Sequence, residues 1–187
     1  MSNSQADYKN IYEATKRFRD VRMDHWLHHD LFSLQWWLLL ALTIVPWFIW
    51  WKLADKQRLL ELMCYGTLIA AICIALDAIG TVNLWWMYRS ELIIQFPGLL
   101  VADISDIPVV FMLVYQYCST WKSFIIAMVF VSIAFAFVIE PLFMRVQLYN
   151  PLSWEYVYSF LVYMFMAMLI RLMVMKLKEQ AVEPLQR

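Results

Sequence analysis

Five stretches of the sequence are each apolar over about the 20 residues that a helix needs to cross the hydrocarbon core of a bilayer. They cover residues 34–53, 59–87, 97–118, 123–144 and 154–175. Hydrophobic residues make up 63% of the 187-residue chain, which is more than one soluble core could bury. Lipid is therefore the expected solvent, and the sequence predicts an all-α fold, a bundle of five transmembrane helices.

The chain divides into three predicted segments. Residues 1–33 form an amphipathic interfacial N-terminal segment, residues 34–178 the five-helix transmembrane bundle, and residues 179–187 a polar C-terminal tail. Within residues 8–26, apolar residues recur every three to five positions and charged residues take the other side. This pattern predicts a helix that lies flat in the lipid headgroup layer. The connections between spans are short, the longest being expected at residues 149–152, so neighbouring helices should run antiparallel.

Away from the first and last few residues of each stretch, four carboxylates lie in apolar stretches that contain no lysine or arginine to neutralise them. They are Asp77, Asp103, Asp106 and Glu140. A charged side chain in hydrocarbon costs about 2.5 to 3.5 kcal/mol even on insertion scales, so such acids face one another, a cavity or a bound cation. Helix order and the rise per residue place all four in one leaflet of the membrane. We therefore predict that Asp77 approaches Asp103 or Asp106 closely enough to share a proton, a water or a cation.

Two prolines in the same half of the bundle favour a polar site there. Pro108 and Pro141 each remove a backbone donor, which frees the carbonyls of Ile104 and Phe137. Carboxylates beside freed carbonyls are what a hard cation or a proton relay would use. Further neutral oxygens expected in this half belong to Asn83, Gln116, Tyr156, Tyr158 and Ser159.

A structural role for these acids is the alternative. An acid that keeps its proton inside a bundle acts as an ordinary hydrogen-bonding group between helices. Asp103 and Glu140 fit this alternative best, since they lie nearer to predicted helix ends. Asp77 lies well inside its helix and is the hardest of the four to explain in this way.

Three histidines end the amphipathic segment. His25, His28 and His29 share one helical face at i, i+3 and i+4, a spacing that can hold a transition metal. A titrating, solvated patch at the membrane surface is the alternative, because no fourth ligand is evident.

Several function classes are disfavoured by the sequence. The net charge of zero argues against a nucleic-acid partner, which would need a cationic face. No P-loop, HExxH zinc motif or GxSxG elbow is present, and no lysine lies in the interior of a predicted span to bind retinal, since Lys52 is at the end of its span. Cys64, Cys73 and Cys118 stand alone in apolar segments, as small buried hydrophobes do.

Three functions stay open on this basis. The expected one is cation- or proton-linked transport or ion handling by the acids. The alternatives are a membrane-embedded enzyme that modifies a lipid with paired carboxylates, and a non-catalytic partner in a membrane assembly. No cofactor is predicted, and a bound cation is the ligand that the acids suggest. The bilayer is the expected partner, with a second copy of the chain or another membrane protein as further candidates.

Charge and aromatic residues near the span ends indicate how the chain sits in the membrane. Lys52, Lys56 and Arg58 crowd one very short loop, and Lys176 and Lys178 follow the last span, which favours a cytoplasmic C-terminus. Tryptophans and tyrosines near the span ends are expected to form belts at the lipid–water interface. Those at the acid-containing end include Trp85, Trp86, Trp154 and Tyr156.

The scattered polar and proline positions resemble those of a family of small five-helix membrane proteins of spore-forming Gram-positive bacteria. The matching features are Asp77 followed by Asn83, residues 97–103 with Pro108, Gln116, the pair Glu140-Pro141, and Trp154 with Ser159. The resemblance covers residues 36–178 and implies a plasma-membrane location. It also implies that Asp77, Asp103 and Glu140 belong to the family pattern, and it implies no mechanism.

Overall fold

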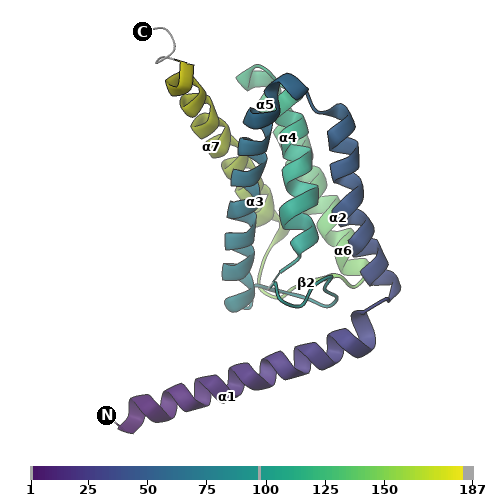
Figure 1. Cartoon of the computed structure of the whole chain (residues 1–187), viewed down its shortest axis with the longest axis vertical. Coiled ribbons are helices and arrows are strands. Elements are labelled where there is room, and N and C mark those ends of the chain that lie inside the picture. Colours follow the sequence, from purple (N-terminus) through teal and green to yellow (C-terminus); the bar gives the residue numbers. More distant parts are fainter. Residues whose placement is uncertain (1, 97, 183–187) are drawn as a thin grey trace.

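The computed structural model describes residues 2–96 and 98–182, and most of them are helical (Figure 1). The α-helices are α1 (Ser2–His25), α2 (Leu34–Leu53), α3 (Leu59–Val82), α4 (Ile107–Tyr117), α5 (Trp121–Ala134), α6 (Glu140–Arg145) and α7 (Tyr156–Val182). Short helical turns adjoin them, namely η1 (Trp26–Asp30), η2 (Lys56–Arg58), η3 (Ala102–Asp106) and η4 (Phe135–Ile139). Two short strands, β1 (Trp86–Tyr88) and β2 (Tyr149–Pro151), complete the described fold.

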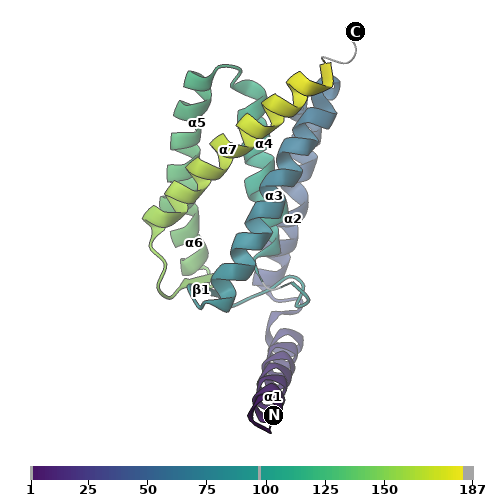
Figure 2. The same cartoon turned by 90° about the vertical axis from the view of Figure 1, so that its left-hand side faces the viewer.

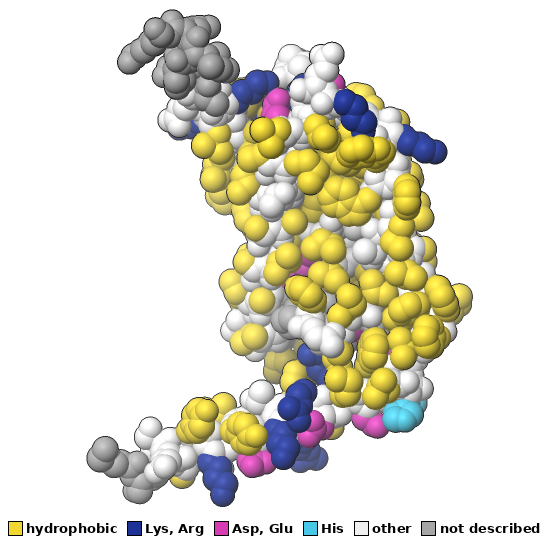
Figure 3. Space-filling view, in the orientation of Figure 1, with side chains coloured by type: hydrophobic (Ala, Val, Ile, Leu, Met, Phe, Trp, Pro, Cys, Tyr) yellow, Lys and Arg dark blue, Asp and Glu magenta, His cyan; other side chains and the backbone are white. Residues whose placement is uncertain are grey.

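Four helical stretches are long and apolar enough to cross a membrane. They are Leu34–Leu53, Lys56–Val82, Trp121–Arg145 and Tyr156–Gln180. Large apolar side chains such as Phe48, Phe130 and Phe165 point outward, with about two thirds of their surface exposed. Figure 3 shows apolar side chains over the length of the bundle, with lysine and arginine near its two ends. An outer surface of this kind suits lipid and not water, so an all-α, multi-pass membrane protein is supported.

The segment predicted as the third span is helical from residue 100 to residue 117. Its first part is the π-helical turn η3, which runs into α4, and α4 packs against α3 and α2. A second π-helical turn, η4, joins α5 to α6, so that these two helices continue one another along one side of the bundle (Figure 2). The π-helical turns η3 and η4 come just before Pro108 and Pro141. One extra residue per turn adapts the hydrogen-bond ladder where proline supplies no N–H.

The prediction of a second helix reaching residue 87, with only short connections, was wrong. α3 ends at Val82, and residues 83–99 form a long connection. Within it, β1 pairs antiparallel with β2, so that Trp86 faces Pro151 and Tyr88 faces Tyr149. The aromatic residues that resembled an interfacial helix end are also good strand formers, and pairing with β2 satisfies their backbone groups.

α1 extends sideways from the end of the bundle that lies opposite the C-terminus (Figure 1). The prediction of a helix over residues 8–26 is confirmed up to His25, and Trp26 begins η1. α1 is exposed along most of its length and is held only near its end. There Arg22 pairs with Glu91 at 2.5 Å, and Trp26 Nε1 donates to the Glu91 carbonyl at 3.0 Å. Asp30 accepts from the Glu91 backbone N–H, which joins η1 to the same connection.

The opposite end of the bundle, here called the basic end, is held by charged groups with partners. The Glu61 carboxylate accepts from Arg58 at 3.1 Å, from Lys178 at 2.9 Å and from the Tyr115 hydroxyl at 2.7 Å. Arg171, only 3% exposed, donates to the carbonyls of Cys118 and Ser119 at the α4–α5 turn. Arg171 therefore holds that turn in place, and Glu61 links the start of α3 to the end of α7.

Candidate functional site

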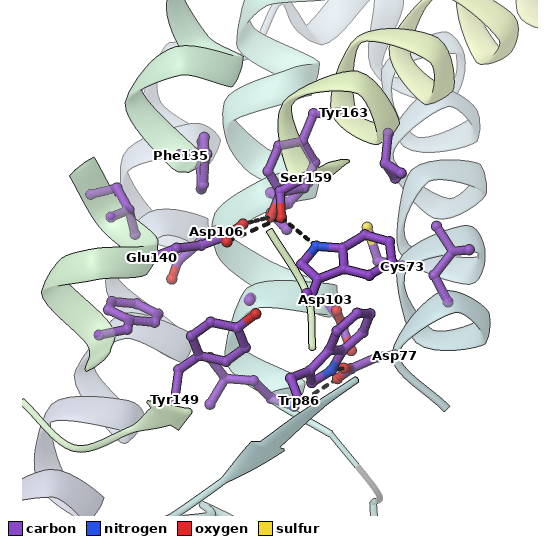
Figure 4. A pocket seen from close by; sticks show the side chains of 18 of the residues that line it. Cys73, Asp77, Trp86, Asp103, Asp106, Phe135, Glu140, Tyr149, Ser159 and Tyr163 are labelled. Carbon is purple, nitrogen blue, oxygen red and sulfur yellow. Dashed lines mark hydrogen bonds between the residues drawn. The ribbon is translucent and has the colours of Figure 1, made fainter. Parts of the chain in front are cut away.

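All four predicted acids line one cavity, here called the acid pocket (Figure 4). Asp77 comes from α3, Asp103 and Asp106 from η3, and Glu140 is the first residue of α6. The cavity has a volume of about 130 Å³, and none of the described residues that line it is a lysine, an arginine or a histidine. Carboxyl groups from three separate elements therefore converge without a cationic side chain among them.

Asp77 is a buried acceptor that holds the connection 83–99 against α3. Its Oδ1 accepts from Trp86 Nε1 at 2.7 Å and from the Tyr88 hydroxyl at 2.6 Å. Its Oδ2 accepts from the Leu99 backbone N–H at 2.8 Å. Burial, together with the neighbouring Asp77 charge, raises the pKa of Tyr88 well above its usual value, so this hydroxyl keeps its proton and stays a donor. Asp77 thus has a structural task, whatever else it does.

Gly98 allows this close approach. Its φ of 146° lies in a region that suits glycine, and a Cβ added there would sit 2.1 Å from Asp77 Oδ2. A methyl group at this position would push the backbone away from the carboxylate. Glycine at 98 is therefore required for the Leu99 N–H to reach Asp77.

Glu140 is likewise satisfied by neutral donors. Its two oxygens accept from the Ser159 hydroxyl at 3.0 Å and from the Tyr163 hydroxyl at 2.9 Å, both on α7. Ser159 in turn accepts from Trp154 Nε1 at 2.9 Å, which extends the chain of hydrogen bonds (Figure 4). Glu140 therefore joins α6 to α7, as a structural acid would.

Asp103 and Asp106 differ from the other two acids, and we call them the open acids. Within residues 2–96 and 98–182, no N–H donates a hydrogen bond to either side chain, and neither does a serine, threonine or tyrosine hydroxyl. Asp103 is only 8% exposed, and its carboxyl lies within hydrogen-bonding reach of the Asp77 carboxyl. Two carboxyl groups can bond in this way only when one of them carries a proton. Asp106 is partly buried and borders the same cavity.

Aromatic rings form much of the remaining wall. The rings that line the acid pocket belong to Trp85, Trp86, Tyr88, Phe135, Phe143, Tyr149, Trp154 and Tyr163. Trp154 stacks on Trp85 with ring centroids 5.3 Å apart and meets Trp86 edge to face at 4.9 Å. The polar atoms of Trp86, Tyr88, Trp154 and Tyr163 are already bonded as described above, so these residues offer the cavity apolar ring surface.

The carbonyl that Pro108 was predicted to free is not available to the pocket. The Ile104 carbonyl accepts a hydrogen bond from Trp47 Nε1 of α2 at 3.2 Å. Ser105, next in the chain, donates to the carbonyls of Leu42 and Thr43 on the same helix. The π-helical turn η3 is therefore hydrogen-bonded to α2 and also carries the open acids, which line the pocket.

Two predicted neutral ligands do not reach the acids, and that part of the prediction was wrong. Gln116 lies at the basic end, where its Oε1 accepts from the Asp55 N–H and its Nε2 donates to the Leu53 carbonyl. It stands near the end of a helix that begins beside the acids, so it had to lie across the membrane from them. Asn83 is exposed and donates back to the Ile79 carbonyl at the end of α3. Of the neutral candidates, Ser159 alone lines the described pocket.

The three histidines do not converge on one point. The rings of His25 and His29 lie 5.0 Å apart, whereas His28 Nδ1 lies 2.9 Å from the Asp24 carbonyl. In the part of the chain that the structure describes, no group of three or more His, Cys, Asp or Glu side chains could hold a metal ion. Metal binding at these histidines stays an untested prediction.

Several residues of the site were expected elsewhere or not at all. Trp86 and Trp154 were predicted to belong to belts at the lipid–water interface, yet their indole N–H groups donate hydrogen bonds to Asp77 and Ser159. Tyr163 was not predicted, although Ser159 and Tyr163 share a helical face at i and i+4. Gly98 was not predicted either, although the sequence contains only three glycines, and a rare glycine indicates a position with a special backbone requirement.

Comparison with known proteins adds no relative. No family model, no curated protein and no solved structure matches the chain. The function therefore has to be argued from the acid pocket itself.

Proposed function

We propose that the protein crosses the membrane five times and that its acid pocket binds a cation in exchange for a proton, as a step in transport or ion handling. The fifth span in this proposal is the helix of residues 100–117, which adds to the four long apolar stretches. Five crossings fit the positions of α1 and the last turn of α7 at opposite ends of the bundle. α1 would then lie along the headgroup layer at the pocket end.

The observation that carries this proposal is the contrast between the two structural acids and the two open acids. Asp77 and Glu140 accept hydrogen bonds from neutral donors, whereas within the described residues no N–H and no serine, threonine or tyrosine hydroxyl donates to Asp103 or Asp106, which border the cavity. An ionised carboxylate at this depth needs a proton or a cation beside it. No lysine, arginine or histidine among the described lining residues supplies that charge. A proton on the carboxyl group or a cation from outside the protein is left to balance it, and we propose that the two exchange there.

Exchange with a proton follows from the contact between Asp77 and Asp103. A contact of this kind between two carboxyl groups can hold one proton. When a cation enters beside Asp103, the proton leaves and the net charge of the pocket stays the same. Neither the enzyme nor the partner alternative has a comparable observation in its favour.

The proposed location is the plasma membrane, with the C-terminus in the cytoplasm. Lys52, Lys56 and Arg58 lie at the same end of the bundle as Lys176 and Lys178, and clusters of basic residues favour the cytoplasmic side. The acid pocket would then lie in the outer leaflet. Membership in the five-helix family of spore-forming bacteria is part of the same proposal and agrees with the number of spans.

The test is a series of thermal melts of the purified protein in detergent, across pH and with chloride salts of Na⁺, K⁺, Mg²⁺, Ca²⁺ and tetramethylammonium. A cation that binds only the folded protein should raise its stability, by about 2.7 kcal/mol at 100 times its Kd. Asp106→Asn should lose this gain, while Asp7→Asn on exposed α1 should keep it. Equal melting of wild type and Asp106→Asn in every salt and at every pH would refute the proposal.

A further inference from the structure

We infer that the cation is a small organic monocation, an amine or a quaternary ammonium of about the size of benzene, and not a metal ion. This inference rests on the proposed function and specifies its ligand. It uses three features of the acid pocket: its oxygen atoms, its rings and its size.

The free oxygen atoms are too few for a hard metal ion. Calcium takes six to eight oxygen ligands, and magnesium requires a nearly regular set of six. In the acid pocket, the oxygens of Asp77 and Glu140 already accept hydrogen bonds, and the Ile104 carbonyl is bonded to Trp47. The open acids and the Tyr149 hydroxyl are left, and the described residues contain no group of three or more His, Cys, Asp or Glu side chains that could hold a metal ion.

The rings supply what an organic cation needs. A quaternary ammonium has no N–H to donate, so it is recognised by aromatic faces together with a negative charge nearby. Trp85, Trp86 and Trp154 pack against one another at one wall of the pocket, and tryptophan is the strongest cation–π partner. The described lining of the acid pocket combines these rings with the open acids and contains no basic side chain.

The surroundings of Asp103 contain no positive group among the described residues that line the cavity. Asp103 is more than nine-tenths buried and lines the cavity, yet within the described residues the one side chain that it contacts within hydrogen-bonding reach is the Asp77 carboxyl group. A buried acid in this position lacks the donors that Asp77 and Glu140 possess. An ammonium or alkylammonium group beside Asp103 and Asp106 would supply the charge.

The cavity volume limits the size of the ligand. The acid pocket encloses about 130 Å³. An engineered protein cavity of about 150 Å³ admits benzene, so a cation with a similar number of non-hydrogen atoms fits. Tetramethylammonium and choline are in this range, whereas tetrabutylammonium is far larger.

The test compares ligands by calorimetric titration of the full-length protein in detergent. Tetramethylammonium and choline should bind, while Na⁺, Mg²⁺, Ca²⁺ and tetrabutylammonium should bind at least ten-fold more weakly. The neutral alcohol 3,3-dimethylbutan-1-ol has the shape of choline without its charge, and should also bind at least ten-fold more weakly. This ligand pair needs no variant, so misfolding cannot obscure its result.

Variants then assign the two parts of the site. Asp106→Asn should weaken tetramethylammonium binding at least ten-fold, and Trp85→Leu should weaken it by about 2- to 30-fold, the usual range of a cation–π contact. Trp37→Leu on α2, whose ring does not line the pocket, should bind as wild type does. If Trp85→Leu does not fold, Phe135→Leu tests the ring wall in its place.

The possible failures are distinct. Binding of Na⁺, Mg²⁺ or Ca²⁺ without tetramethylammonium, lost in Asp106→Asn, would overturn the organic ligand and leave the cation pocket standing. Equal binding of choline and its neutral analogue would also overturn the organic cation. If no cation binds at all, the proposed function fails as well.

Discussion

The two ends of the bundle treat buried charge in opposite ways. At the basic end, the Glu61 carboxylate meets Arg58 and Lys178, and the Arg171 guanidinium meets two carbonyls. At the acid end, four carboxyl groups share one cavity, and none of the described residues that line it is cationic. Charges that have partners fix helix ends, whereas a charge without one leaves a place for a ligand. Variants of the two ends should therefore differ in kind.

The largest effect is expected within the acid end itself. Asp77→Ala leaves the Trp86 indole, the Tyr88 hydroxyl and the Leu99 N–H without their acceptor. Each unpaired buried group costs about 1–3 kcal/mol, so the free energy of unfolding should fall by about 3 kcal/mol or more. Asp106→Ala, which strands no donor, should cost less than about 1 kcal/mol in cation-free buffer. Thermal melts in detergent measure the loss of stability of each variant. Equal losses for Asp77→Ala and Asp106→Ala would contradict the distinction between structural and open acids.

A smaller contrast is expected at the basic end. Arg171→Met removes two charge-assisted hydrogen bonds to carbonyls and should cost about 2–4 kcal/mol, because such bonds contribute about 1.5–3 kcal/mol each and some are recovered by water. Lys178→Met breaks an ion pair whose lysine is 57% exposed, and should cost no more than about 1 kcal/mol. Both variants should keep cation binding, since neither residue lines the acid pocket. Loss of binding in either one would show that the two ends are not separate.

The smallest effect concerns the attachment of α1 to the pocket end. Burial raises the pKa of Glu91 above its ordinary value, although Arg22 opposes the rise. Glu91 therefore keeps its proton to higher pH when α1 is docked than when α1 is undocked. Docking should weaken as the pH rises from the ordinary pKa of Glu91 through its raised pKa. Glu91→Gln cannot ionise, so its docking should vary less with pH over that window. Hydrogen exchange of the backbone amides at the end of α1, corrected for intrinsic exchange rates, measures how docking changes with pH. An equal change of protection with pH in wild type and Glu91→Gln would contradict the prediction.

Much of the fold was predictable from the sequence because apolar length is a strong signal in a lipid solvent. The four long stretches appear where hydropathy placed them, and the α1 helix appears where its periodicity did. The end of α3 was not predictable in the same way. Residues 84–88 are aromatic and apolar, and Trp86–Tyr88 form a strand because they pair with β2, more than 60 residues further along the chain.

The sequence was enough to predict the acids of the site, but not the side chains that donate hydrogen bonds to them. Depth along each helix was enough to suggest that Asp77, Asp103, Asp106 and Glu140 lie in one half of the bundle. Which acid is satisfied depends on single side chains that arrive from the connection 83–99 and from α7. The prediction for Gln116 was wrong because α4 runs away from the acids, so its last turn lies at the basic end. Pro108 failed as a source of a free carbonyl because Trp47 reaches across from α2.

The most direct measurement is the number of protons released when a cation binds to the acid pocket. It can be obtained by calorimetric titration of the wild type with tetramethylammonium in buffers of different ionisation enthalpy. Exchange at the Asp77–Asp103 contact predicts the release of up to about one proton per bound cation near neutral pH, and none from Asp103→Asn. Cation binding without proton release in the wild type, or the same release from Asp103→Asn, would contradict the exchange of a cation for a proton at the open acids.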